Sequence, residues 1–134
     1  MNRKTLFGAA LALLVAQRAL AEQAAGPQAA LEWLSLVDGG AYAQSWAAAG
    51  TIFKAQISAS AWAQTIKAAR EPLGAASARA LTSEVQTATL PGAPAGRYDV
   101  LTFKTNFANK PAAGETVVLA KEPSGWRVDG YFIR

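Results

Sequence analysis

The side chains best suited to acid–base chemistry in this chain are its aspartates and tyrosines. A carboxyl group held in an apolar pocket can act as a general base, while a tyrosine hydroxyl beside it donates a hydrogen bond, as in small isomerases and lyases that work inside a cavity. The candidates for these roles are Asp38, Asp99, Asp129, Tyr42, Tyr98 and Tyr131.

Local patterns favour structural roles for the three aspartates. Asp38 lies in an Asp-Gly-Gly sequence at a predicted helix end, where aspartate commonly makes turn hydrogen bonds. Asp99 and Asp129 alternate with apolar residues in predicted strands, so we expect them to face water or to pair with arginine. We therefore predict no catalytic residue and keep the small cavity enzyme only as an alternative.

The composition excludes several other kinds of chemistry. The chain has no cysteine and no histidine, which rules out Ser-His and Cys-His nucleophilic catalysis, thiol redox chemistry and ordinary zinc ligation. Its Asp and Glu residues are scattered and show no calcium-loop spacing. We predict neither a metal site nor a cofactor.

Aromatic and arginine side chains are the better candidates for binding. Such residues line the mouths of many ligand pockets, although tryptophans at helical spacing, such as Trp33 and Trp62, also form helix-to-sheet cores. Arg70 and Arg79 flank a Pro-Leu-Gly turn, where they can hold an anion or form structural ion pairs with Glu71 or Glu84. The predicted ligand-binding residues are Tyr42, Trp46, Trp62, Arg70, Tyr98 and Tyr131.

The first 21 residues read as a cleavable secretory signal peptide. Arg3 and Lys4 supply a positive start, residues 6–16 are apolar, and Ala19-Leu20-Ala21 offers a small-x-small cleavage site. The apolar run is about half of the roughly 20 residues that a spanning helix needs. We expect cleavage after Ala21 and a periplasmic or secreted protein without a stable membrane anchor.

Removal of this leader changes the charge balance. Arg3, Lys4 and Arg18 lie within it, so residues 22–134 keep ten basic against nine acidic residues, a net charge of +1. The mature chain shows no basic stripe with interleaved aromatics, and we predict no nucleic-acid partner. Its 113 residues are the size of one domain.

The periodicity of residues 22–134 predicts helices first and strands afterwards. A helix beginning near Pro27 presents Ala30, Trp33, Leu34 and Val37 on one side, and a second short helix carries Tyr42, Trp46 and Ala49. Residues 52–57 are expected to form a short extended link, and a third helix begins at Ser58 or Ser60 and ends before Pro72. Four strands are predicted: the first begins near residue 78 and contains Leu81, Ser83 and Val85, and the others cover residues 97–107, 115–121 and 126–133, with loops at 90–96 and 109–114. This order predicts an α+β fold with three N-terminal helices packed on a curved four-stranded antiparallel sheet.

The last connection is compact enough to suggest a register. A two-residue loop at Ser124-Gly125 places Glu122 opposite Arg127, although Gly125 at the end of a type I turn also fits. The first arrangement sets Leu119 opposite Gly130 and Val117 opposite Phe132. It predicts one apolar face that contains Val117, Leu119, Val128 and Phe132.

Motifs along the whole mature chain resemble a known family. They are Ala30-x-x-Trp33-Leu34, Val37-Asp38-x-Gly40-x-Tyr42-x-x-Ser45-Trp46, Trp62, Arg70-x-Pro72-Leu73-Gly74, Leu90-Pro91-Gly92-x-Pro94-x-Gly96-x-Tyr98, Phe103-x-x-x-Phe107, Glu115 and Gly125-Trp126-Arg127-Val128-x-Gly130-Tyr131. In this order they resemble the small exported bacterial proteins grouped as domain of unknown function 4019. The resemblance implies no activity, and the order of elements is similar to the cone-shaped roll of nuclear transport factor 2-like (cystatin-like) folds.

The function that we expect from the sequence is a non-enzymatic binding or interaction module of the cell envelope. Its partner is an unidentified small ligand or an envelope protein. A structural subunit that forms homodimers through its sheet stays open as a further alternative.

Overall fold

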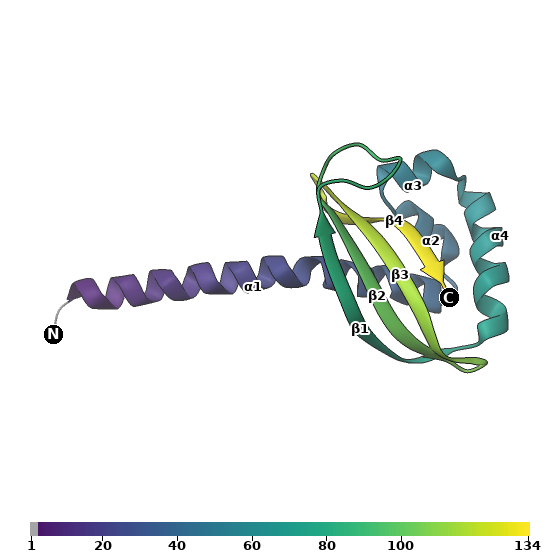
Figure 1. Cartoon of the computed structure of the whole chain (residues 1–134), viewed down its shortest axis with the longest axis horizontal. Coiled ribbons are helices and arrows are strands. Elements are labelled where there is room, and N and C mark those ends of the chain that lie inside the picture. The colour runs from purple at the N-terminus through teal and green to yellow at the C-terminus, as the bar shows by residue number, and fades with distance from the viewer. Residues whose placement is uncertain (1–2) are drawn as a thin grey trace.

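One long helix, α1 (Arg3–Asp38), begins the fold of residues 3–134, the part of the chain that a computed structural model describes. Its first half extends away from the rest of the molecule (Figure 1). The prediction that this helix begins near Pro27 is therefore wrong. Pro27 removes the hydrogen bond to the Gln23 carbonyl, but Gln23 is exposed, so water can satisfy that group and the alanine-rich helix continues. Within residues 3–134, no helix combines the length and the apolar character that crossing a membrane requires.

Three more helices and one short turn follow. They are α2 (Tyr42–Ala47), α3 (Thr51–Gln56), α4 (Ala59–Arg70) and the 3₁₀ turn η1 (Glu71–Leu73). Ser58 caps α4 as expected, since its Oγ accepts a hydrogen bond from the Ala61 N–H at 3.2 Å.

The residues of α3 were expected to form an extended link, and this prediction is wrong. Two carboxylates from the sheet accept N–H groups at the start of the helix: Glu122 Oε2 from Thr51 at 3.0 Å and Asp129 Oδ1 from Phe53 at 3.2 Å. An exposed helix start leaves its first N–H groups without partners, and anions are favourable there. Contacts with residues distant in sequence thus determine the conformation of this segment, which is too short for its hydrophobic periodicity to predict a helix.

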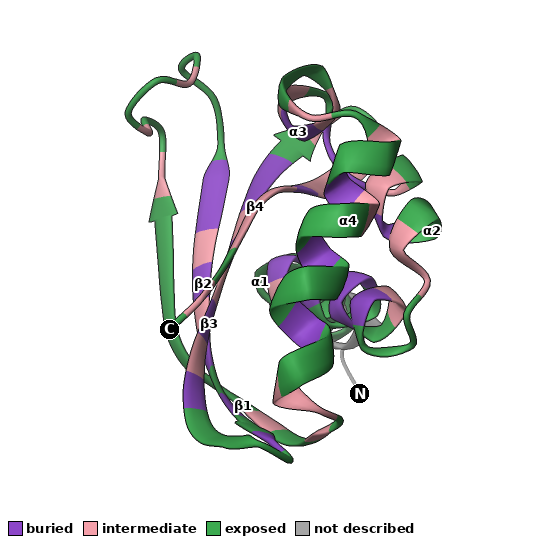
Figure 2. Cartoon of the chain, turned by 90° about the vertical axis from the view of Figure 1, so that its right-hand side faces the viewer, coloured by how far each residue is buried: buried purple, intermediate pink, exposed green. Residues whose placement is uncertain are grey.

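The second half of the chain is an open antiparallel sheet. Its strands are β1 (Ala76–Thr87), β2 (Tyr98–Phe107), β3 (Lys110–Glu122) and β4 (Gly125–Ile133), arranged in that order. β3 begins at Lys110, inside the segment predicted as a loop. Figure 2 shows two layers, with the helices over one face of the sheet and no described helix over the other. The α+β prediction is confirmed.

β1 is an edge strand, and most of its residues are exposed. Its pairing with β2 shifts between Leu81 and Ser83, where Thr82 has no residue opposite it. A second shift lies between Ala76 and Ala78, so three segments of β1 pair with β2 in different registers.

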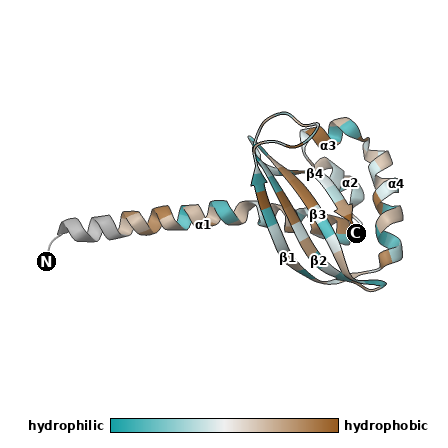
Figure 3. Ribbon diagram, in the orientation of Figure 1, coloured by the Kyte–Doolittle hydropathy of each residue, from teal (hydrophilic) through white to brown (hydrophobic). Residues whose placement is uncertain are grey.

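The core lies between α1, α4 and the covered face of the sheet. Ala30, Trp33, Leu34 and Val37 are buried, which confirms the predicted stripe of α1. They pack against Leu101, Phe103, Val117, Leu119 and Val128, on the strands whose apolar residues are brown in Figure 3.

The predicted register of the last hairpin is wrong. Glu122 pairs with Gly125, so the loop is Pro123-Ser124, and Arg127 lies opposite Ala120. Gly125 has a φ of 123°, a conformation that favours glycine and lets β4 begin directly after the loop.

A bulge then shifts the strand by one further residue. Asp129 has no partner on β3, because Val128 pairs with Leu119 and Gly130 with Val118. A one-residue shift exchanges the two faces of a strand. Tyr131 therefore packs in the core beside Trp33, and Phe132, predicted to be on the apolar face, is 58% exposed.

Candidate functional site

Polar side chains from six elements, two helices and four strands, meet near the C-terminal ends of α1 and α4. They form what we call the Asp38–Glu115 cluster. Asp38 ends α1, Arg70 ends α4, and the strands β1 to β4 each supply one member. The full set is Asp38, Arg70, Arg79, Thr105, Glu115 and Tyr131.

Glu115 is the centre of the inner half of this cluster. Glu115 is fully buried. Its Oε1 accepts hydrogen bonds from Arg79 Nε at 2.7 Å and from the Thr105 hydroxyl. The Tyr131 hydroxyl donates to its Oε2. A buried carboxyl group is costly unless each oxygen has a donor, and these three donors meet that requirement.

Asp38 joins two arginines at the outer half. Its Oδ1 lies 2.6 Å from Arg70 Nη2 and 3.0 Å from Arg79 Nη2, and its Oδ2 lies 2.8 Å from Arg79 Nη1. The Arg70 guanidinium also lies 4.8 Å from the centre of the Phe107 ring. Arg79 therefore bridges the two carboxyl groups, in the fork geometry that arginine offers and lysine does not.

The pKa shifts follow from this arrangement. Burial raises the pKa of Asp38, but the hydrogen bonds and charges of Arg79 and Arg70 outweigh it, and the pKa lies below the ordinary 3.8. Burial lowers the pKa of Arg79, and its bonds to Asp38 and Glu115 outweigh that effect and raise it. Burial and the neighbouring Glu115 raise the pKa of Tyr131. Tyr131 therefore stays a protonated donor.

Sequence reasoning found part of this cluster. It singled out Asp38, Arg70, Arg79 and Tyr131, but it paired the arginines with Glu71 or Glu84 and gave Glu115 no chemical role. The available signal for Glu115 is its position two residues before Val117 and four before Leu119, on the same, apolar face of a strand. A carboxylate at such a position needs buried partners.

Beside the cluster lies the α1–α4 pocket, a cavity of about 370 Å³. Tyr42 and Arg70, both predicted to bind a ligand, line it together with Asp38. The rest of its wall is formed by Val37, Gly39, Gly40, Glu71, Gly74 and Ala75. The lining residues thus include a tyrosine, an arginine and two acidic residues, Asp38 and Glu71.

The two tryptophans predicted to bind a ligand have structural contacts. Trp62 is buried, and its Nε1 donates to Ser45 Oγ at 2.9 Å. Trp46 packs against the core, and its Nε1 donates to the Ile57 carbonyl at 2.9 Å. Both indole N–H groups are therefore used within the protein.

Tyr98 lies apart from the other predicted residues. It stands on the sheet face opposite the helices, and its hydroxyl donates to the Pro94 carbonyl in the β1–β2 loop. The structure thus brings Tyr42, Arg70 and Tyr131 to one region and does not bring Tyr98 there.

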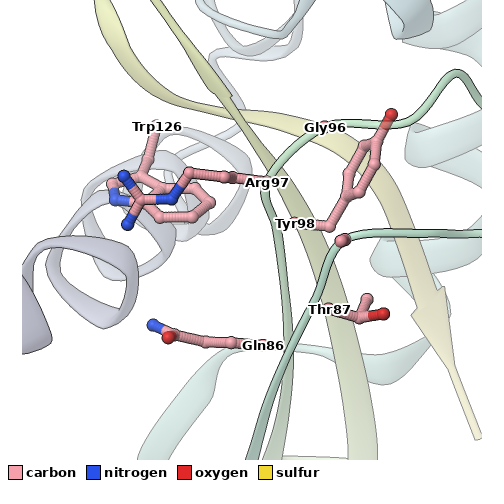
Figure 4. Close-up of a pocket in the computed structure, with 7 residues that line it drawn as sticks. Gln86, Thr87, Gly96, Arg97, Tyr98 and Trp126 are labelled. Atoms are coloured by element: carbon pink, nitrogen blue, oxygen red, sulfur yellow. The ribbon is translucent and has the colours of Figure 1, made fainter.

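A second cavity, of about 230 Å³, lies at the far end of the sheet. Figure 4 shows Arg97 lying over the ring of Trp126 in this cavity; the guanidinium carbon is 5.9 Å from the ring centre, and Lys121 Nζ is 5.5 Å from it. No role was predicted for these residues from the sequence. Because two cations of the chain already lie against this ring, we do not assign the cavity to a further cation.

A sequence comparison matches residues 29–131 to the family of proteins of unknown function DUF4019. The chain belongs to the DUF4019 family. The match spans every member of the Asp38–Glu115 cluster and leaves out residues 1–28. No curated protein and no solved structure matches the chain at a significant level.

A small cavity enzyme that uses Asp and Tyr requires an aspartate in hydrogen-bond contact with a tyrosine hydroxyl. None of the three aspartates of this DUF4019 protein makes such a contact among the described residues. Asp38 is held by arginines, and Asp129 is held by the α3 N-terminus. The acid that does meet a tyrosine is Glu115, and none of the described cavities has Glu115 in its lining. Within the part of the chain that the structure describes, no group of three or more His, Cys, Asp or Glu side chains is placed to hold a metal ion.

Asp99 differs from the other two. It is fully buried on the helix-facing side of β2, and neither of its Oδ atoms has a hydrogen-bond partner among the described residues. Burial and the nearby Glu84 raise its pKa to about 7. Asp99 therefore lacks the stabilising partners that every carboxyl group of the cluster has.

Proposed function

We propose that this protein is exported, loses its first 21 residues, and serves in the periplasm as a non-enzymatic binding module. Its ligand is a small polar molecule that carries a hydrogen-bond acceptor, and it occupies the α1–α4 pocket. The observation that carries this proposal is the pocket itself, in which Tyr42 lies beside Arg70 and Asp38, two members of a cluster whose acids and bases already pair with one another.

Several features support export. The protruding half of α1 exposes large apolar side chains, with Leu11 at 65%, Leu13 at 61% and Val15 at 61%. Residues 10–24 of the helix are all exposed, and burial begins at Ala25 and Gly26. A segment that contributes nothing to the core and carries an apolar run suits a leader that is read and removed.

Binding in this pocket is supported over catalysis by the titratable groups beside it, and Asp99, whose pKa is about 7, lines none of the described cavities. A general base works best with a pKa near the working pH, whereas the pKa of Asp38 is lowered and that of Tyr131 is raised. The pocket still offers binding groups. Tyr42 and Arg70 both line it.

The test is native mass spectrometry of the protein purified from periplasmic extract. We expect an N-terminus at Glu22 and a bound small molecule that is lost on unfolding. Tyr42→Phe removes only a hydroxyl from the pocket, and we expect it to reduce the bound fraction about tenfold without changing stability. Tyr98→Phe, on the opposite face, is the matched control and should retain the ligand.

Two results contradict the two parts of this proposal separately. An intact N-terminus on protein confined to the cytoplasm contradicts export. A clean apo mass, together with no cross-linked partner in the periplasm, contradicts binding.

A further inference from the structure

Asp99 and Gly26 are in unusually close contact. Asp99 is fully buried with both carboxyl oxygens unpartnered among the described residues. A Cβ placed on Gly26 would overlap Asp99 Oδ2 and stand 3.2 Å from its Cγ. The carboxyl group of Asp99 therefore fills the space that a side chain at position 26 would take.

Gly26 and Pro27 are the residues expected at the start of a helix, yet here they lie inside one. Proline is favoured at the first helical position, because its missing N–H would have no partner there anyway. The residue before it is then the N-cap, whose side chain normally accepts the N–H groups of the second and third helical positions. Glycine at position 26 has no side chain for this role.

In the uncut chain these N–H groups are already in use. A continuous helix pairs the N–H groups of Gln28 and Ala29 with the carbonyls of Ala24 and Ala25, one turn earlier. That turn is exposed up to Ala24. Glu22 of that turn forms an ion pair at 3.5 Å with Arg97, the residue before β2, and both side chains are more than 60% exposed.

We propose that Asp99 is the N-cap of α1 in the processed protein, accepting the backbone N–H groups of residues 28 and 29 after residues 1–21 are removed. This inference rests on the export step of the proposed function. Once the leader is gone, residues 22–25 form a single terminal turn, and Pro27 cannot bond back to it. The turn unwinds, the N–H groups become free, and the buried carboxylate gains the donors that it lacks.

The groups around Asp99 predict how its pKa changes when the leader is removed. Glu84 approaches it from β1, and the helix α1 packs against it at Gly26. In the uncut chain, burial and Glu84 raise its pKa to about 7. N–H donors and a helix N-terminus act in the opposite direction and lower the pKa of a carboxyl group.

The experiment compares the uncut chain with a chain that begins at Glu22, using ¹³C NMR to follow the Asp99 carboxyl group against pH. We expect a midpoint near pH 7 in the uncut chain and a midpoint lower by at least about one pH unit in the processed chain. Hydrogen exchange at Gln28 and Ala29 should stay slow in the processed chain, since both N–H groups remain bonded.

Variants make the assignment specific. Asp99→Ala should lower the melting temperature of the processed chain by roughly 3–8 °C, and at pH 8 it should leave that of the uncut chain unchanged or higher. In the double variant Asp99→Ala/Gly26→Ser, the smaller alanine leaves room for a serine that can cap the helix. This second change should restore the melting temperature of the processed chain but not that of the uncut chain. Asp129→Asn, which alters the α3 cap present in both forms, is the control and should affect both equally.

Equal titration of Asp99 in the two chains overturns the inference, and so does an Asp99→Ala effect of the same size in both. Both chains are purified directly, so these results stand whether or not the cell exports the protein. Uncut protein in the cell contradicts export and leaves the comparison intact.

Discussion

Replacing Arg79 by methionine removes the cation that Asp38 and Glu115 share. Glu115 is 0% exposed, and it would keep only the hydroxyl donors of Thr105 and Tyr131. Asp38 would lose both of its bonds to Arg79, at 2.8 and 3.0 Å. Breaking a buried ion pair on one side costs about 3–5 kcal/mol, because a charge is left without compensation.

A loss of this size is a large part of the roughly 5–15 kcal/mol that stabilises a domain. The melting temperature of R79M should fall by about 10–20 °C. Urea denaturation followed by tryptophan fluorescence measures the change directly, since Trp33 and Trp62 lie in the core. R79M/E115Q should be more stable than R79M, because it also removes the unpaired carboxylate.

The matched control is Lys67→Met. Lys67 and Glu71 form an ion pair at 4.0 Å in which both side chains are 61% exposed, and its loss should cost less than about 0.5 kcal/mol. If R79M costs no more than K67M, the cluster behaves as a solvent-screened surface pair, and our account of its energetics is refuted.

Three further predictions concern the caps and the cluster. Ser58→Ala removes the oxygen that accepts the Ala61 N–H and should cost about 1 kcal/mol; an unchanged denaturant midpoint would contradict this role. Gly50→Ala would bring a Cβ into overlap with Asp129 Oδ1 and should cost roughly 1–3 kcal/mol, visible as faster hydrogen exchange in α3, whereas unaltered exchange would show that the cap adjusts freely. Because the pKa of Asp38 is lower when folded than its ordinary 3.8, its stabilising effect is present above pH 3.8 and is lost as the pH falls through the folded value. Calorimetry from pH 6 to pH 2 should show this loss in the wild type and a smaller one in Asp38→Asn.

Sequence reasoning succeeded where the signal is local. The spacing of Ala30, Trp33 and Val37 predicted the buried side of α1, and Ser58 predicted the start of α4, because both signals lie within a few residues of the structure that they determine. The order of helices and strands predicted the fold class for the same reason.

Prediction from the sequence failed where contacts between residues distant in sequence determine the structure. Residues 51–56 form a helix because Glu122 and Asp129, distant in sequence, cap it. Asp129 bulges from β4 to reach that helix, and the bulge moves Tyr131 onto the face where it meets Glu115. The pairing of β4 beyond the bulge and the place of Tyr131 in the candidate site therefore depend on one contact between layers, which no pattern within β4 encodes.

The shifted pairing of β1 also bears on how the sheet meets other chains. The outer edge of β1 presents free backbone N–H and C=O groups, and such edges act as templates for aggregation. The irregularity at Thr82 interrupts that template, so an added strand could follow residues 78–81 or residues 83–87 in register but not both. Under the export that we propose, the chain refolds among many other proteins, and it then benefits from an edge that no partner can extend along its whole length.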